Sequence, residues 1–346
     1  MKKVLLVTEY LNPPYDEGIK KTVYNLFSEL DSNFELLTIC RYGFEKENII
    51  ITNSNKLFLS YSLFKIIKDF NPHSVIYFPF QSSTFASYLR LKVLSLICRT
   101  KKILFITLQP KPLSTWQKKL IPFLKPKFAF TPSPSLHNFW NKVGIKNNLV
   151  TLLTDLSKFK PVTNKDVKYE LRKKYGFQQN VTIITHMGHL NEGRNLKTLL
   201  PLQSETVQVV IVSSSSTPDD ALGHISLKKE LLNSGIFILD KYIEHIEELY
   251  QLSDLYIFPV IDENSSIGLP LSVLEARACG IPVITTDYGS LKYFLGDDGG
   301  CLHYASPENF HKTVKQVLSN KNDCKKTNVS ELNNKFFEII FSKINN

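Results

Sequence analysis

Two side chains in the sequence have the chemistry to hold a ligand that carries phosphate or hydroxyl groups. Arg194 lies in THMGHLNEGRNLKTLL (185–200), shortly after an apolar run that ends at Gly188. Glu275 lies in SSIGLPLSVLEARACGIPVI (265–284), in the middle of a short, mostly apolar segment that we predict to be a helix. A guanidinium can bind a phosphate through two parallel hydrogen bonds, and a buried carboxylate needs donors from the protein or from a ligand. The two residues therefore indicate either a ligand site, or a surface arginine in an ordinary turn and a glutamate bonded within the protein.

Two glycines at predicted strand ends leave the same alternatives open. Gly188 lies where a strand meets a loop and then a helix near Arg194, so backbone N–H groups there could approach an anion at the helix N-terminus. Gly18 occupies a similar strand, loop and helix in TEYLNPPYDEGIKKTVYNL (8–26). Ligands of parallel sheets bind at the carboxyl ends of strands, so Gly18 could let a ligand lie close to the backbone. An ordinary turn glycine is the alternative at both positions.

Continuous apolar runs predict the strands that position these residues. The runs do not alternate with polar residues, which is typical of parallel sheets covered on both faces. In the first half they are VLLVTE (4–9), FELLTI (34–39), SVIYFPF (74–80), ILFITL (103–108) and FAFTPS (128–133). In the second half they are VTIITHMG (181–188), VQVVIVSS (207–214), IFIL (236–239), DLYIFPV (254–260) and PVITT (282–286). We therefore expect an α/β fold of two Rossmann-like domains, with parallel sheets facing a central cleft.

A charged segment separates the two sets of strands and marks the domain boundary. The chain of 346 residues is long enough for two domains, each with its own core. The segment FKPVTNKDVKYELRKKYG (159–176) contains no apolar run. We place an N-terminal domain at residues 1–163 and a C-terminal domain at 164–325. Residues 326–346 are predicted to form a C-terminal helix that could cross back to the N-terminal domain.

The charge and the cysteines limit the classes of partner and compartment. A net charge of +10 and a pI near 9.1 favour a polyanionic partner, and no nucleic-acid-binding motif is present, so we expect none of that class. The five cysteines lack CxxC spacing, which predicts reduced thiols in a cytoplasm and no metal site. No apolar run approaches the ~18 residues of a membrane span. The basic and apolar stretches 89–102 and 118–127 could contact anionic lipid, or be solvated helix faces, which the sequence favours.

The longest motif resembles a known family. GLPLSVLEARACGIPVITTDYGSL (268–291) is similar to the C-terminal signature of glycosyltransferase family 4, the group 1 glycosyltransferases. GHLNEGRN (188–195) stands where that family has its phosphate loop, LLTDLSKFKP (152–161) resembles its interdomain segment, and Gly18 matches its Gly-Gly loop. The resemblance implies a GT-B fold whose C-terminal domain holds most of a nucleotide-diphosphate sugar. It also implies sugar transfer with retention at the anomeric carbon, without a metal and without a cofactor.

The resemblance also implies roles for individual residues. Arg194 stands at the phosphate-binding lysine and is expected to neutralise the donor diphosphate. Glu275 stands at the glutamate that bonds the ribose hydroxyls, and Gln109 at the place of a histidine near the donor sugar. The remaining expected donor-binding residues are Gly18, Gly188, His189, Tyr242, Gly268 and Leu269.

The chain departs from the family pattern at a position that matters for catalysis. The family has an earlier glutamate eight residues before Glu275, where this chain has Ile267. Glu263, or Asp262, in the longer preceding loop could take over that role, and a solvated loop acid is the alternative. His189 and Asn195 also replace the usual Arg and Gly.

We therefore consider two hypotheses for the function of this protein. The first is a retaining, metal-independent glycosyltransferase that acts on a glycan, lipid-linked or small-molecule acceptor, in the cytoplasm or peripherally at the inner face of the membrane. The second is a non-catalytic GT-B protein that binds a sugar nucleotide or a glycan. A sugar-nucleotide epimerase fits less well, because few acids are expected at the site. A nicotinamide dehydrogenase is disfavoured, because no GxGxxG comes after either opening strand.

Overall fold

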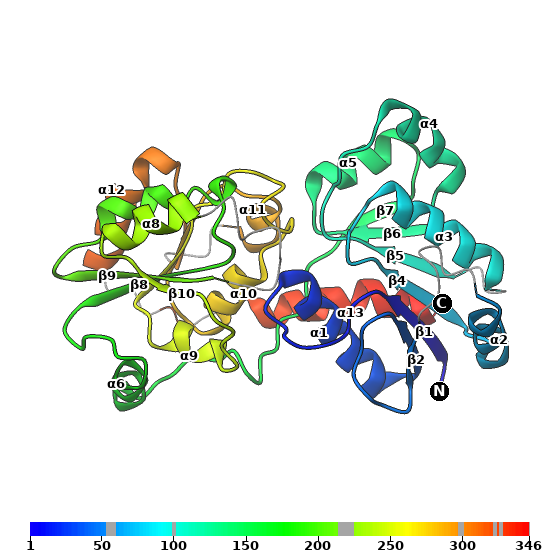
Figure 1. The fold of residues 1–346 in the computed structure, drawn as a ribbon, viewed down its shortest axis with the longest axis horizontal. Coiled ribbons are helices and arrows are strands. Elements are labelled where there is room, and N and C mark those ends of the chain that lie inside the picture. Colours follow the sequence, from blue (N-terminus) through cyan, green and yellow to red (C-terminus); the bar gives the residue numbers. More distant parts are fainter. Residues whose placement is uncertain are drawn as a thin grey trace. The chain divides into compact units, whose positions relative to one another are not determined.

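The chain folds into two compact units of similar size (Figure 1). The computed structural model describes residues 1–52, 60–98, 102–213, 225–296, 301–320, 324 and 328–345. The N-terminal unit comprises Met1–Leu153, Ile267–Leu269 and Leu332–Asn346, and the C-terminal unit comprises Thr154–Ser266 and Pro270–Glu331. The first long stretch of the N-terminal unit thus ends ten residues before residue 163, where the sequence predicted the boundary.

The N-terminal unit is built on a seven-stranded sheet in the order β3-β2-β1-β4-β5-β6-β7, and all of its strand pairs are parallel. The central strands are buried along almost their whole length, which explains why they are continuous apolar runs in the sequence. The strands are β1 (Lys3–Thr8), β2 (Glu35–Cys40), β3 (Ile49–Ile51), β4 (Ser74–Phe78), β5 (Ile103–Ile106), β6 (Phe128–Thr131) and β7 (Asn147–Leu149).

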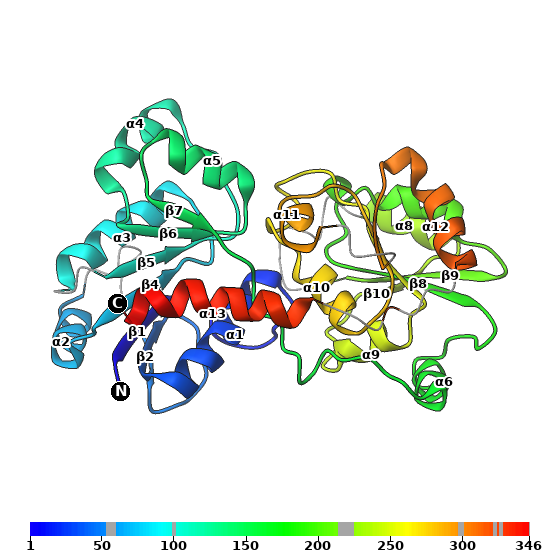
Figure 2. The same cartoon turned by 180° about the vertical axis from the view of Figure 1, so that it is seen from behind.

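Helices cover both faces of this sheet. One face packs against apolar side chains of α2, α3, α4 and α5 in a single core cluster that includes Leu5, Tyr77 and Phe105 from the strands. That cluster contains no residue of α1 or α13, and α13 crosses the face turned to the viewer in Figure 2. The helices are α1 (Gly18–Asn33), α2 (Tyr61–Phe70), α3 (Phe85–Ile97), α4 (Thr115–Leu124), α5 (Pro134–Lys142) and α13 (Val329–Asn345).

The last helix, α13, belongs to the N-terminal unit although it comes after the C-terminal unit in the sequence. Its buried side chains recur at helical spacing and include Leu332, Phe336, Ile340 and Ile344. The ring of Phe341 lies against Phe34 with the centroids 5.1 Å apart. The end of the chain is therefore part of the core of the unit in which the chain begins.

The C-terminal unit is built on a six-stranded parallel sheet in the order β10-β9-β8-β11-β12-β13. Its strands are β8 (Thr182–Met187), β9 (Val207–Val212), β10 (Phe237–Leu239), β11 (Leu255–Phe258), β12 (Val283–Thr285) and β13 (Leu302–Tyr304). Its α-helices are α6 (Lys165–Lys174), α8 (Ile225–Asn233), α9 (Ile246–Gln251), α10 (Leu271–Ala278), α11 (Leu291–Leu295) and α12 (Phe310–Ser319). Its 3-10 helices are η1 (Glu192–Arg194), η2 (Leu196–Leu202) and η3 (Pro307–Asn309). The predicted α/β class with two parallel sheets is confirmed.

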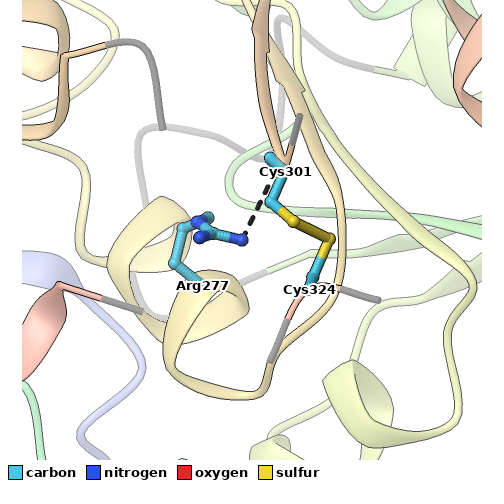
Figure 3. Close-up of a disulfide and its surroundings, with 3 residues drawn as sticks. All are labelled: Arg277, Cys301 and Cys324. Atoms are coloured by element: carbon cyan, nitrogen blue, oxygen red, sulfur yellow. Dashed lines mark hydrogen bonds between the residues drawn. A yellow bond between two sulfur atoms is a disulfide. The ribbon is translucent and has the colours of Figure 1, made fainter. Parts of the chain in front are cut away.

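The expectation that all five cysteines are reduced is wrong for one pair. Cys301 and Cys324 form a disulfide in the C-terminal unit, with their Cα atoms 5.5 Å apart, and Nη1 of the buried Arg277 donates to the Cys301 carbonyl at 3.5 Å (Figure 3). The two cysteines are 23 residues apart in the sequence and carry no motif that would have paired them. Cys40, Cys98 and Cys279 are free and buried.

The described part of the chain contains neither a candidate membrane span nor a candidate metal site. Within it, no helix is long and apolar enough to span a membrane. The same residues contain no group of three or more His, Cys, Asp and Glu arranged to hold a metal ion.

Candidate functional site

Arg194 is held directly against Gly188 in the C-terminal unit. β8 ends one residue before Gly188, and the chain returns through η1, so that the Arg194 side chain lies over the glycine Cα and is only 7% exposed. A Cβ atom at position 188 would lie 1.9 Å from Nη1 and 2.5 Å from Cζ of Arg194. Gly188 also has a φ of +151°. A side chain at position 188 would therefore displace the guanidinium from the place that it occupies, and the positive φ favours glycine.

The turn after Gly188 does not form the expected anion site at a helix N-terminus. The Gly188 N–H donates to the Val212 carbonyl at 2.9 Å, which extends the β8–β9 pairing, so it is not directed at a ligand. The helix predicted near Arg194 is instead the three-residue η1, capped by the Asn191 side chain, which accepts from the Arg194 N–H at 3.0 Å. Asn195 then adopts a left-handed conformation with a φ of 55° and separates η1 from η2. Any anion binding at this turn therefore depends on the Arg194 side chain rather than on a helix dipole.

His186 places a neutral imidazole beside Arg194. This residue is 1% exposed, and its Nδ1 lies 2.9 Å from the Ile257 carbonyl, so Nδ1 carries the proton and donates. Burial lowers the pKa of His186 to about 3, and the charge of Arg194 acts in the same direction. The sequence prediction did not include His186, although a histidine inside the apolar run VTIITHMG was a visible signal. The positive charge of this cluster is thus carried by Arg194 at physiological pH.

The loop that precedes α10 is closed by Asp262 next to the η1 turn. Oδ2 of Asp262 accepts from the Ser265 hydroxyl at 3.0 Å, and Oδ1 accepts from the Asn264 N–H at 3.1 Å. These hydrogen bonds, the one from the Asn264 backbone first, hold the pKa of Asp262 below its usual value. A Cβ atom at Gly193 would lie 2.0 Å from the Ser265 hydroxyl, so the loop packs directly on the glycine of η1. Asp262 is ionised and shapes the loop.

Glu263, the other acid of this loop, has an exposed side chain and a fixed backbone. The Tyr288 hydroxyl donates to the Ser266 carbonyl at 2.8 Å and to the Glu263 carbonyl at 3.3 Å. Burial raises the pKa of Tyr288, and the charge of Arg194 acts in the opposite direction. Tyr288 therefore links the loop to the surroundings of Arg194. We predicted no role for Tyr288 from the sequence, although it lies within the TTDYGS part of the recognised motif.

Glu275 has a partner within the protein. It lies on α10, is 3% exposed, and its Oε2 accepts from the Tyr250 hydroxyl of α9 at 2.8 Å. Burial raises the pKa of Tyr250 well above its usual value, and the neighbouring Glu275 adds to that effect, so the hydroxyl stays protonated and continues to donate. The carboxylate is thus oriented by a buried tyrosine, which the sequence pattern did not reveal.

Ile267 covers Gly18 in the N-terminal unit. A Cβ atom at Gly18 would lie 3.1 Å from Cδ1 of Ile267, whose side chain is 7% exposed. The next residue, Gly268, donates its N–H to the Leu108 carbonyl at 3.1 Å, and a Cβ atom there would lie 2.6 Å from Cα of Ser133. Position 267, where the resemblance suggested a carboxylate, is thus occupied by an apolar side chain that fills one side of Gly18.

The expected site residues fall into two groups, one in each unit. Gly18, Gln109, Gly268 and Leu269 belong to the N-terminal unit, and Gln109 is buried with its carbonyl accepting from the Ser83 hydroxyl at 2.8 Å. The second group belongs to the C-terminal unit and consists of Gly188, His189, Arg194, Tyr242, Glu263 and Glu275.

Of this second group, the structure brings Arg194 and Gly188 into contact and places the loop containing Glu263 beside the η1 turn. Tyr242 lies between β10 and α9 with 48% of its surface exposed.

A cavity of about 190 Å³ opens in the N-terminal unit, and Pro110, the residue after Gln109, is part of its lining. It is lined mainly by apolar side chains such as Tyr88 and Phe139, together with Lys111 and Lys118. Burial lowers the pKa of Lys111. The cavity thus combines an apolar wall with two basic groups, which suits an amphipathic or acidic ligand.

Comparison with known proteins identifies the C-terminal unit. Residues 167–330 match the family described as glycosyl transferases group 1. These residues belong to the group 1 glycosyltransferases. The matched stretch contains η1, the Asp262 loop, α10 and Tyr288, and therefore every part of the Arg194 and Glu275 clusters.

Curated relatives align with about half of the chain. The UDP-Gal:alpha-D-GlcNAc-diphosphoundecaprenol alpha-1,3-galactosyltransferase of Escherichia coli is 27% identical over 214 residues, which are 54% of this chain and 51% of that enzyme. The alpha-galactosylglucosyldiacylglycerol synthase of Streptococcus pneumoniae is 24% identical over 189 residues, 51% of this chain and 48% of that enzyme. The chain thus spans about half the length of these curated relatives.

The fold is that of GT-B glycosyltransferases over the whole chain. Anabaena HepE, solved in complex with UDP-glucose, superposes with a TM-score of 0.74 over 99% of this chain and 100% of its own, at 14% identity. An identity this low establishes the common fold and nothing about the ligand.

Proposed function

We propose that the protein is a glycosyltransferase that moves a sugar from a nucleotide-diphosphate donor to a glycan, lipid-linked or small-molecule acceptor. The observation that carries the proposal is the contact of Arg194 with Gly188, in the part of the chain that belongs to the group 1 family. As the bond between the sugar and the diphosphate breaks, negative charge develops on the leaving group. A buried guanidinium beside a neutral imidazole is fixed in place before the reaction and can stabilise that charge.

The roles of the other residues are inferred from their contacts. Glu275, oriented by Tyr250, would accept hydrogen bonds from ribose hydroxyls of the donor. The Asp262 loop and Tyr288 would shape the space next to Arg194 in which the transferred sugar lies. We further propose that transfer proceeds with retention and without a metal ion, because Arg194 supplies the positive charge that a metal would otherwise provide.

Donor and acceptor classes are proposed from the relatives. HepE was solved with UDP-glucose, and the Escherichia coli relative carries UDP-Gal and a diphosphoundecaprenol compound in its name, so UDP-sugars are the first donors to test. The cavity with Lys111 and Lys118 in the N-terminal unit is the candidate acceptor site. We expect the acceptor to combine an apolar part with an anionic group.

The proposal is tested by calorimetric titration of the full chain with UDP, GDP and ADP, with and without a chelator. Binding of one of these diphosphates, unchanged by the chelator and lost in Arg194→Ala, is the expected result. Turnover is then measured as release of the diphosphate from the matching sugar nucleotides in the presence of lipid and glycan acceptors. The absence of binding by all three diphosphates to the folded protein would contradict the proposal.

A second candidate function is favoured by Ile267. The family has an acid at the position of Ile267, and here this apolar side chain packs on Gly18. The protein could therefore bind a sugar nucleotide without transferring the sugar. Diphosphate binding with no release from any donor, with or without acceptors, would support this alternative. Release that disappears in both Arg194→Ala and Glu275→Gln would exclude it.

A further inference from the structure

The excess positive charge of the chain is concentrated in one stretch of the N-terminal unit. Residues 70–153 contain twelve Lys and Arg but no Asp or Glu, whereas the whole chain has a net charge of +10. The rest of the chain therefore has a net charge of −2. A surface formed by this stretch attracts anions without any acidic side chain of its own to oppose them.

Helix α4, within that stretch, exposes three large apolar side chains on one face. Trp116, Leu120 and Phe123 are 57%, 42% and 74% exposed. With spacings of four and three residues they fall within an arc of about 60° around the helix axis. Ile121, on the other side of the helix, is fully buried in the core. The helix is thus anchored by one apolar face and presents a second one outward.

This outward face is held in a defined position. Ser114 and Gln117 form a capping box at the start of α4, which fixes where the helix begins. The Trp116 ring packs edge-on against Phe85 of α3, with the centroids 5.1 Å apart. The three apolar side chains are therefore presented by a preformed element and need little ordering to bind a partner.

Exposed lysines lie on α4 and directly after it. They are Lys119, Lys125 and Lys127. Lys118 lies on the opposite side of the helix from the apolar face and lines the cavity instead. Lysine stems can lie along an apolar surface while their ammonium groups reach outward to anionic groups. Arg90 of α3 does not join this surface, because it is paired with the half-buried Glu9.

We propose that α4 docks the N-terminal unit on an anionic membrane surface. Trp116, Leu120 and Phe123 enter the boundary between headgroups and acyl chains, and the neighbouring lysines bind the anionic headgroups. A nucleic acid would bind the lysines but leave the three large apolar side chains in water. The preference for a solvated helix face, drawn from the sequence, is thus replaced for 118–127 because of the exposure of Leu120 and Phe123. This inference goes beyond sugar transfer and does not depend on it.

The two tryptophans of the chain provide a direct readout. Trp140 is fully buried and donates to the Tyr88 hydroxyl at 2.7 Å, so a change in fluorescence on adding vesicles reports on Trp116. The full chain is mixed with phosphatidylcholine vesicles with and without phosphatidylglycerol. We expect a blue shift, and quenching by brominated acyl chains, only with phosphatidylglycerol. Both signals weaken with added salt, because salt screens the lysines.

Two variants separate the apolar from the electrostatic contribution. Leu120→Ser/Phe123→Ser keeps the tryptophan reporter and is expected to bind vesicles at least about tenfold more weakly, since it removes two of the three inserted side chains. Lys119→Glu/Lys125→Glu is expected to lose the preference for phosphatidylglycerol and to bind these vesicles at least about 30-fold more weakly, because it removes two lysines and adds two negative charges. The matched control, Ile225→Ser/Tyr293→Ser, removes side chains that are 64% and 71% exposed in the C-terminal unit, and should bind as the unchanged chain does.

Three outcomes would overturn the proposal. They are failure of the folded chain to float with phosphatidylglycerol vesicles, unchanged binding by Leu120→Ser/Phe123→Ser, and binding to heparin or DNA that matches vesicle binding in all variants. The last result would identify a general polyanion site. Melting curves of each variant show that it is folded. UDP titration of the same samples keeps the proposed function separate, because vesicle binding can fail while nucleotide binding persists.

Discussion

At the residue scale, the position of Arg194 depends on the absence of a side chain at Gly188. Both residues could be predicted as site residues from the sequence, because a glycine at a strand end and an arginine a few residues later are typical of a phosphate-binding turn. The glycine was predicted to have a different task, because only the structure shows that the Gly188 N–H is used by Val212 and that the guanidinium occupies the free space. Nothing in the spacing reveals which group fills the room that a glycine leaves.

Gly188→Ala is predicted to reduce nucleotide-diphosphate binding strongly. The new methyl group would lie 1.9 Å from Nη1 of Arg194, so the guanidinium has to leave its place. Loss of a hydrogen bond to a charged group costs about 1.5–3 kcal/mol, which corresponds to a loss of affinity of about ten- to a hundredfold. Calorimetric titration of the variant measures this loss.

The matched control is Gly176→Ala, also in the C-terminal unit. Gly176 has a φ of +73°, and a Cβ atom there would meet nothing within 4 Å. This variant has the backbone strain of alanine at positive φ without displacing Arg194, so its affinity should be unchanged. Equal affinity of Gly188→Ala and Gly176→Ala would show that Arg194 does not bind the diphosphate.

Tyr250→Phe is predicted to destabilise the C-terminal unit by about 1.5–3 kcal/mol, because it removes a donor from the buried carboxylate of Glu275. Chemical denaturation measures the change in the free energy of unfolding. Combining it with Glu275→Gln in a double-mutant cycle should give a clear coupling energy between the two residues. Tyr169→Phe, at a 52% exposed tyrosine, is the control and should change stability little. A coupling energy near zero would contradict the assigned contact.

At the element scale, the sequence predicted the interior strands and the edge strand β10, and missed the other three edge strands. All ten predicted apolar runs overlap a strand of the structure. Nine of these strands lie inside their sheets, where burial on both faces favours continuous apolar residues. The missed strands β3, β7 and β13 each have three residues and lie at the edges of their sheets. β7 consists of Asn147, Asn148 and Leu149, so it carries no apolar pattern at all. The predicted helix after Gly188 became two 3-10 helices because Asn195 adopts a left-handed conformation between them.

Helix α13 provides a prediction that belongs to this scale. Phe336 is 1% exposed in the core of the N-terminal unit, and Phe336→Ala removes a large buried side chain. We expect a loss of about 3–5 kcal/mol in the free energy of unfolding of that unit. Glu338→Ala, at a less buried position of the same helix, controls for helix propensity and should change stability by less than about 0.5 kcal/mol. Equal denaturation midpoints for the two variants would show that α13 does not complete this core.

At the scale of the whole molecule, the family match and the excess positive charge lie in different parts of the chain. The family match and the Arg194 cluster lie in the C-terminal unit, whereas the positive charge that first indicated an anionic partner lies in residues 70–153 of the other unit. Net charge, read as one number, pointed to the donor phosphates. Its distribution, together with the exposed face of α4, points to a second anionic partner. The composition alone could not distinguish these two anionic partners, because it does not say where along the chain the charges lie.

The Cys301–Cys324 disulfide contradicts the expectation of reduced thiols, and it makes the stability of the protein depend on redox conditions. The bond closes a segment of 23 residues, which the loop-entropy relation converts to about 3 kcal/mol of stability. Reductant is therefore expected to lower the melting temperature of the C-terminal unit by about 6–12 °C.

Alkylation of denatured, unreduced protein followed by mass spectrometry should label Cys40, Cys98 and Cys279 only. Cys301→Ser/Cys324→Ser is the control, since it should melt at the lower temperature with or without reductant, and labelling of all five cysteines in the unchanged chain would rule the bond out.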